Sequence, residues 1–160
     1  MKKTSKFVLI FVFFVACLYI IFRLSLPTLI VAIHKDQYVN NILVVNPPLT
    51  DKAKIHWWKK NKAKIKSYFD IPSSRSDGTF TIIFWDFGDG YSPLTPRNLD
   101  MLPGNNTDYL YCFDDMKVKA NCIEKKQIMT ITKSTSGRIY ITTNKRYLLK
   151  ENGKFIEEKE

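Results

Sequence analysis

The stretch that decides the architecture is Phe7–Phe22, FVLIFVFFVACLYIIF, sixteen residues with no charge and no strongly polar side chain. As a helix it is about 24 Å long, slightly short of a hydrocarbon core of roughly 30 Å. Extension to Leu26 adds Arg23, whose guanidinium can reach the membrane interface. Pro27 then disfavours helix at the residue before it. The sequence therefore predicts one membrane-spanning helix, from about Ser5 to Ser25.

The charges that flank this run predict its orientation. Three lysines and the amino terminus precede it, and only Arg23 lies just after it. Because basic residues are retained on the cytoplasmic side, we expect a cytoplasmic N-terminus. Residues 1–27 would then be a cytoplasmic stub and an anchor in the bacterial inner membrane, and residues 28–160 would form a single periplasmic domain.

Two other fates of the N-terminus remain open. A cleaved signal peptide has an apolar stretch of roughly 7–15 residues and an A-x-A-like site, whereas this run is longer and no such triplet follows it closely. A lipoprotein would be cut before Cys17, but Phe14 is a bulky residue for the third position before that cut. The mature lipoprotein would also begin with an apolar segment. An uncleaved anchor is the interpretation that we favour.

Length and composition exclude several classes of protein. A chain of 160 residues holds one modest domain. With 45% apolar and 25% charged residues it is not a disordered chain. No repeat of about 20–50 residues is found, which excludes a solenoid or a propeller.

The basic charge is concentrated in one segment. The chain carries +10 in total, and four of its 25 basic residues belong to the anchor. The remaining 21 basic and 15 acidic residues leave +6, which is the charge of Asp51–Lys66 alone, with seven Lys and one Asp. Because the basicity is local and the compartment is periplasmic, we expect no nucleic-acid partner.

The residue pattern after the anchor predicts a hairpin, a helix and a central strand. Thr28–His34 and Ile42–Val45 are β-branched runs separated by a polar turn. Thr50 is a candidate N-cap for an amphipathic helix from Asp51 to about Tyr68, a segment without Gly or Pro. Thr79–Phe87, TFTIIFWDF, is the strongest strand signal in the chain.

The second half of the chain is expected to be mostly β. Residues 91–107 contain three prolines and are predicted to be a long loop of functional interest. Further strands are predicted at 109–113, 127–133, 138–143, 147–150 and 154–157. The predicted fold class is therefore α+β: a single N-terminal transmembrane helix, followed by a small domain with an antiparallel sheet and one main amphipathic helix.

Cys112 and Cys122 are the two cysteines of the predicted domain, because Cys17 lies in the span. In an oxidising periplasm we expect them to form a disulfide, which would close a loop of about eleven residues and contribute roughly 3 kcal/mol. The alternative is two separate reduced thiols. The spacing is not C-x-x-C, so a redox-active pair is not expected.

Residues that could carry catalysis or bind a metal do not form a known pattern. His34 and His56 stand in no metal-ligand spacing, and neither a nucleophile elbow nor a phosphate-binding loop occurs. Four aspartates could form an acidic cluster, but turn and strand-end roles suit their spacing better than Ca²⁺: Asp86, Asp89, Asp114 and Asp115. We therefore expect a non-enzymatic protein without a cofactor or metal.

The lysine-rich helix has three interpretations. It can be a solvated basic face with its tryptophans in the core, a surface for anionic lipid headgroups of the inner membrane, or a surface for an acidic protein partner. The candidate partner- or lipid-binding residues are Lys52, Lys59, Lys60, Lys64, Lys66 and Trp57.

Several segments resemble the enterobacterial putative membrane protein family called domain of unknown function 943. The stretches are TDKAKI at 50–55 with the following Trp57–Trp58 and Lys62, GTFTIIFWDFGDGY at 78–91, YCFDDM at 111–116 and NCIEK at 121–125. The family has no established activity, so the resemblance implies a membrane placement and no mechanism.

Our leading hypothesis is an inner-membrane protein with a periplasmic interaction domain, of the immunity type that neutralises a toxin acting on the envelope. The expected contact surface is the lysine-rich helix together with the 91–107 loop. The alternative is an envelope module that binds anionic lipid or a small ligand.

Overall fold

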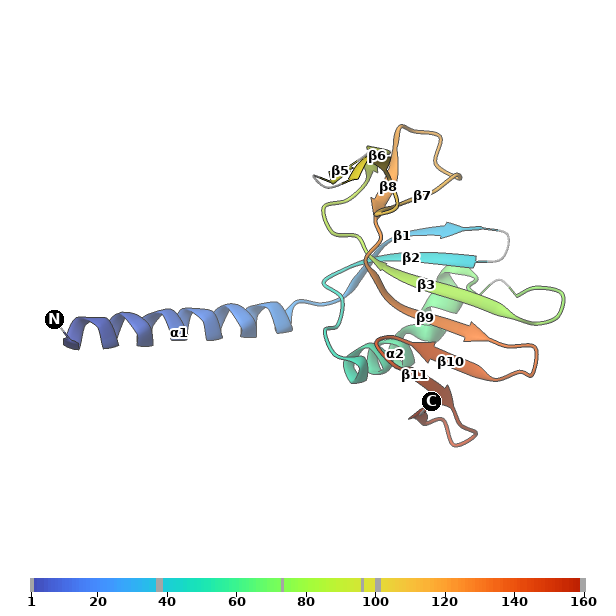
Figure 1. The fold of residues 1–160 in the computed structure, drawn as a ribbon. Coiled ribbons are helices and arrows are strands. Elements are labelled where there is room, and N and C mark those ends of the chain that lie inside the picture. The colour runs from blue at the N-terminus through green and yellow to red at the C-terminus, as the bar shows by residue number, and fades with distance from the viewer. Residues whose placement is uncertain (1, 37–38, 73, 96, 100–101, 159–160) are drawn as a thin grey trace.

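The predicted N-terminal helix is confirmed. The computed structural model describes residues 2–36, 39–72, 74–95, 97–99 and 102–158. Helix α1, Lys2–Ser25, projects from the rest of the chain, and Figure 1 shows that no other element packs along it. Its apolar stretch, Lys6–Arg23, is long and apolar enough to cross a membrane. None of this stretch is buried against the described part of the chain.

The domain that follows α1 is built on a seven-stranded sheet. The hairpin predicted at its start is confirmed: Leu29–Lys35 (β1) pairs antiparallel with Val39–Val45 (β2), with Ile33 opposite Ile42. In spatial order the strands that follow β2 are Phe80–Asp86 (β3), Gln127–Lys133 (β9), Ile139–Thr142 (β10), Arg146–Leu149 (β11) and Phe155–Glu157 (β12).

The predicted antiparallel sheet is confirmed, and it contains one parallel pair that the sequence pattern did not indicate. Strands β2 and β3 run in the same direction, with Ile42 opposite Phe84. The reason is the helix α2, Asp51–Phe69, which lies between them in the chain. A parallel pair needs a crossover of a dozen or more residues, and α2 supplies it.

The boundaries of α2 follow from its terminal residues, as predicted. The Thr50 side chain accepts a hydrogen bond from the backbone N–H of Ala53 at 3.2 Å, which satisfies one of the free donors of the first turn. At the other end Asp70 adopts a left-handed conformation, φ 50°, and its N–H donates to the carbonyl of Lys66 at 3.0 Å. Such a residue commonly ends a helix.

The 91–107 segment is not one long loop. It contains Ser92–Pro93 (β4), Arg97–Leu99 (β5) and Leu102–Asn106 (β6), while residues 96, 100 and 101 lie outside the described residues. Strand β4 joins a three-stranded sheet with Leu110–Cys112 (β7) and Ala120–Glu124 (β8), a strand that we did not predict. These strands are two to five residues long, so their pairing depends on tertiary contacts and their own propensity gives little signal.

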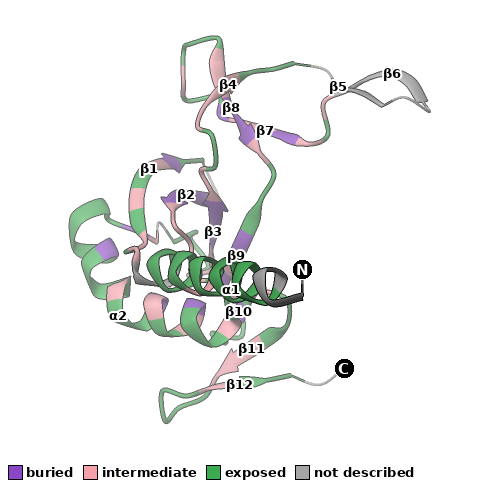
Figure 2. Cartoon of the chain, turned by 90° about the vertical axis from the view of Figure 1, so that its left-hand side faces the viewer, coloured by how far each residue is buried: buried purple, intermediate pink, exposed green. Residues whose placement is uncertain are grey.

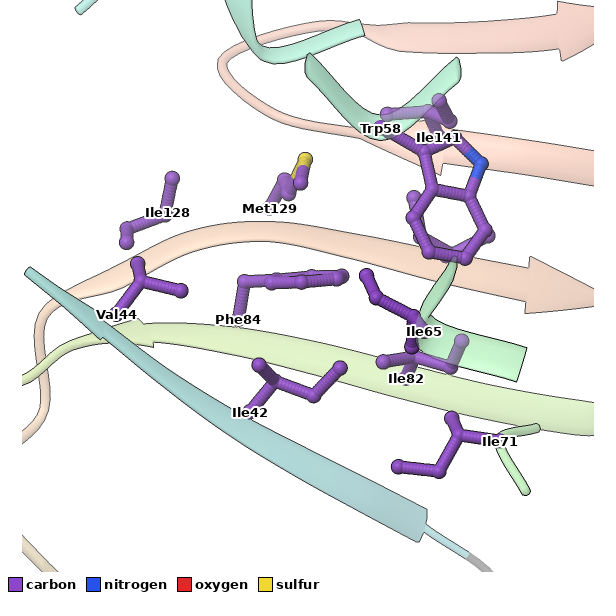
Figure 3. Close-up of a cluster of buried hydrophobic side chains, with 11 residues drawn as sticks. Ile42, Val44, Trp58, Ile65, Ile71, Ile82, Phe84, Ile128, Met129 and Ile141 are labelled. Carbon is purple, nitrogen blue, oxygen red and sulfur yellow. The ribbon is translucent and has the colours of Figure 1, made fainter. Parts of the chain in front are cut away.

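The main sheet is covered on both faces near β1–β3. Along β2, Ile42 and Val44 pack with Trp58 and Ile65 of α2, whereas Leu43 points the other way. This alternation is the pleat of a strand, and it creates two cores. The first lies between the sheet and α2, where Figure 3 shows the side chains of β2, β3 and β9 facing those of the helix. The second lies between the sheet and the β7–β8 hairpin.

Candidate functional site

The inner face of α2 fixes the helix on the domain. Trp58 and Ile65 are buried, and the Trp58 ring meets Phe84 edge-to-face with centroids 5.9 Å apart. The expectation that the tryptophans anchor the core is thus confirmed for Trp58. Trp57 is only partly buried.

One lysine of α2 belongs to the interior. Lys54 is buried, and its ammonium lies 3.8 Å from a carboxylate oxygen of Asp51. The other oxygen of Asp51 accepts a hydrogen bond from the Tyr147 hydroxyl of β11 at 3.1 Å. Burial, and then the bond to Asp51, raise the pKa of Tyr147. These contacts hold the first turn of α2 against β11 and remove Lys54 from the surface.

The five candidate lysines are all exposed on the outer side of α2, and we call them the basic face: Lys52, Lys59, Lys60, Lys64 and Lys66. Figure 2 looks along α1 toward the domain and shows the exposed outer side of α2 beside the point where α1 enters. Lys59 donates a hydrogen bond to the carbonyl of Gly153 at 3.0 Å, in the turn before β12. The side chains of Lys52 and Lys60 make no hydrogen bond or ion pair with the described part of the chain.

Two hollows flank Trp57. The first, which we call the basic hollow, has a volume of about 650 Å³ and is lined along the N-terminal half of α2 by residues that include Lys52, Ile55, His56, Trp57, Lys59 and Lys60. The second, which we call the edge groove, has a volume of about 430 Å³ and lies between the start of β1 and the rest of α2. Its lining includes Leu29, Ile30, Trp57, Lys64, Ile65 and Tyr68.

The expected joint surface of the lysine-rich helix and the 91–107 segment is not formed. Figure 1 places β5 and β6 far from α2, with the main sheet between them. The 91–107 segment therefore does not extend the basic face, contrary to our prediction.

The predicted disulfide is confirmed. Cys112 and Cys122 are directly opposite in the β7–β8 register, and their sulfurs are 2.02 Å apart. The hairpin that they close carries Phe113 and Asp115 toward β1. His56, the other histidine considered in the sequence, lies exposed on α2.

A polar cluster around the buried His34, which sequence reasoning missed, joins the two sheets. The Nδ1 atom of His34 lies 2.9 and 2.8 Å from the two carboxylate oxygens of Asp115, and its Nε2 atom lies 2.6 Å from the hydroxyl of Tyr91. In the neutral ring, Nδ1–H donates to Asp115 and the Tyr91 hydroxyl donates to Nε2. The ring also stacks on Phe113, with centroids 3.8 Å apart. Burial, and then the charge of Asp115, raise the pKa of Tyr91.

Both ring nitrogens of His34 therefore have hydrogen-bond partners. We call His34, Tyr91 and Asp115 the junction, because they connect β1 to the small sheet.

Asp86, another of the four aspartates, accepts a hydrogen bond from the N–H of Gly88 at 3.2 Å, which is the turn role that we expected. The sequence carried no signal for the junction, because His34 and Asp115 are 81 residues apart.

Comparison with known families settles the relationship of the chain. The family described as enterobacterial putative membrane protein (DUF943) matches residues 1–159. The chain belongs to this family. The apolar α1 and the match over nearly the whole chain agree on a membrane protein with a single N-terminal anchor. No curated protein and no solved structure matches the chain.

Proposed function

We propose that this member of the family is a non-enzymatic, single-pass inner-membrane protein whose periplasmic domain binds an acidic protein through the basic face of α2. The observation that carries the proposal is the concentration of exposed lysines on a helix that is fixed to the domain. Trp58 and Ile65 hold one side of α2 in the core, so the lysines project from fixed backbone positions on its exposed side. A concentrated charge of one sign steers an oppositely charged partner and selects against others.

The basic hollow adds an anchor point to this charge. Its wall includes the partly buried Trp57 and Ile55, and its rim includes Lys52, Lys59 and Lys60. Binding energy in protein interfaces concentrates where an apolar or aromatic group fills a pocket that polar residues surround. We infer that an apolar side chain of the partner enters this hollow while its carboxylates pair with the lysines.

The more specific proposal is an immunity role, in which the partner is a toxin that acts on the envelope. It is supported by the small size of the chain, its single anchor and its concentrated charge. A protein tethered beside the membrane can meet such a toxin at its place of action. The identity of the captured partner decides this part of the proposal.

The experiment is crosslinking in intact cells, followed by affinity capture of the tagged full-length protein and mass spectrometry. We expect one dominant acidic protein, and we expect Lys52→Glu/Lys60→Glu to reduce its capture at least tenfold. Lys62→Glu is the matched control, since Lys62 is exposed on α2 and lines neither hollow. Equal capture by the folded double variant and the wild type would contradict the proposal.

A further inference from the structure

The edge groove is an apolar hollow whose lining is open to solvent. Ile30 and Ile65 form its floor, because both belong to the core between the sheet and α2. Leu29 and Tyr68 lie along its mouth with 53% and 72% of their surfaces exposed. Large apolar side chains that remain exposed around a concavity mark a binding surface. The groove is distinct from the basic hollow, and the two share only the Trp57 side chain.

One end of the groove lies next to the membrane. Thr28 and Leu29 line it, and Thr28 follows the last residue of α1, Ser25, by only three positions. An extended chain rises about 3.3 Å per residue, so Thr28 lies within roughly 10 Å of the helix end. The headgroup layer of a bilayer adds roughly 5–8 Å on each side of the hydrocarbon core. The Thr28–Leu29 end of the groove therefore lies beside the lipid headgroups.

The start of the groove is also held in a fixed place. The Thr28 hydroxyl donates to the carbonyl of Asn46 at 2.7 Å, and the Arg23 guanidinium of α1 donates to the Asn46 side chain at 3.1 Å. These bonds connect the last turn of α1, the first residues before β1 and the end of β2. A lipid molecule in the leaflet next to the end of α1 can therefore enter the groove at its Thr28 end without crossing bulk water.

The rim of the groove carries a positive charge suited to a phosphate. Lys64 lines the groove, and its ammonium lies 6.0 Å from the centre of the Tyr68 ring. An ammonium at this distance from an aromatic face is held by cation–π attraction. Asp51, the one acidic residue of α2, is engaged with Lys54 and Tyr147 at the opposite end of the helix. Lys64 is the charged residue in the lining of the groove, and the nearest acidic residue along the chain is the exposed Asp70, which caps α2 after Phe69.

We infer that the edge groove binds an anionic phospholipid from the leaflet at which α1 ends. Its acyl part lies against Leu29, Ile30 and Ile65, and its phosphate pairs with Lys64. Apolar walls and a single basic rim match this amphiphile, and the membrane supplies it at the Thr28–Leu29 end of the groove. The site shares Lys64 with the basic face and Trp57 with the basic hollow, whereas Lys52 and Lys60 line only the basic hollow, so variants at those two lysines separate it from the proposed protein site.

The test uses the full-length protein in lipid nanodiscs that contain phosphatidylglycerol with a photoreactive acyl chain. A second set carries the same photoreactive chain on phosphatidylcholine. After illumination, mass spectrometry maps the labelled residues. We expect the anionic probe to label the groove at Leu29, Trp57 or Tyr68 as well as α1, and the zwitterionic probe to label α1 alone.

Variants separate the groove from nonspecific contact. Lys64→Glu should reduce groove labelling by at least about fivefold, the factor that one basic charge near an anionic surface contributes, while labelling of α1 stays constant. Lys64→Arg and the control Lys62→Glu should retain groove labelling. Unlabelled groove peptides, equal labelling by both probes, or equal loss in Lys64→Glu and Lys62→Glu would overturn the inference.

A competition arm distinguishes a lipid from a free anion. Replacing chloride with inorganic phosphate at constant ionic strength should leave groove labelling unchanged, because the apolar walls hold the acyl chain. Displacement of the probe by phosphate would assign the groove to a free anion and overturn the lipid inference. Failure here leaves the protein-partner proposal intact, since that proposal is tested with Lys52→Glu/Lys60→Glu.

Discussion

Replacing His34 with alanine should lower the free energy of unfolding by about 3 kcal/mol. The stacking of its ring on Phe113 contributes roughly 0.5–1.5 kcal/mol and the hydrogen bond from Tyr91 about 1 kcal/mol. The bond to the Asp115 carboxylate belongs to the stronger, charge-assisted class, roughly 1.5–3 kcal/mol. Because the Asp115 side chain is 46% exposed, water replaces part of that bond and its lower bound applies.

The assay is urea unfolding of the full-length protein in detergent micelles, followed by tryptophan fluorescence. Asp115→Ala should cost less than His34→Ala, roughly 1–2 kcal/mol, and a double-mutant cycle should give a coupling energy of about 1 kcal/mol between the two residues. His56→Ala is the matched control, since His56 is exposed, and should change stability by less than about 0.5 kcal/mol. A loss below about 1 kcal/mol for His34→Ala, or no coupling with Asp115, would refute the junction. Capture of the partner should persist in these variants, because the junction lies on the other face of the sheet from α2.

Three further outcomes follow from the same structure. Removing the disulfide with Cys112→Ser/Cys122→Ser should cost roughly 3 kcal/mol in a urea titration, and a reductant should then have no further effect. Thr50→Ala should lower stability by about 1 kcal/mol in that assay, whereas an unchanged midpoint would refute its capping role. The raised pKa values of Tyr91 and Tyr147 contribute stability that is complete below pH 10, their unfolded value, and is lost as the pH rises through their folded values. In Tyr91→Phe the free energy of unfolding should fall less steeply with pH above pH 10. The same slope in the variant and the wild type would contradict the raised pKa of Tyr91.

The sequence predicted those parts of the fold that depend on local pattern. The apolar run gave α1, the N-cap at Thr50 gave the start of α2, and Gln127–Lys133 coincides with β9. The number of cysteines in the domain and the expected oxidising compartment together predicted the disulfide. For the two helices and the strand, the pattern that predicts the element lies within one continuous segment. For the disulfide, the prediction needs only the presence of two cysteines in the domain.

The parts that were missed depend on contacts between distant segments. The parallel β2–β3 pair follows from the way α2 crosses the sheet, which strand propensity cannot report. Strand β8 gains its order from β7 and β4 on either side. The junction of His34 with Tyr91 and Asp115 joins residues 57 and 81 positions apart, so no local spacing marks it.

The lysine-rich helix illustrates both cases. Its charge and its start were read from the sequence, and all five candidate lysines are exposed as an interaction surface requires. The burial of Lys54 and the two hollows beside Trp57 became visible only once α2 was placed against β1 and β11. We propose these two hollows as the binding positions on the lysine-rich helix.

The most direct test of the proposed interaction is the affinity of the captured partner for the full-length protein as ionic strength is raised. For the wild type we predict that binding weakens steeply with salt, because exposed charges are screened. Lys52→Glu/Lys60→Glu should raise the dissociation constant at least tenfold at low salt and make it less sensitive to ionic strength. Lys62→Glu should change the dissociation constant and its dependence on ionic strength by a smaller factor. Equal dissociation constants for the wild type and the double variant, at every salt concentration, would contradict the account.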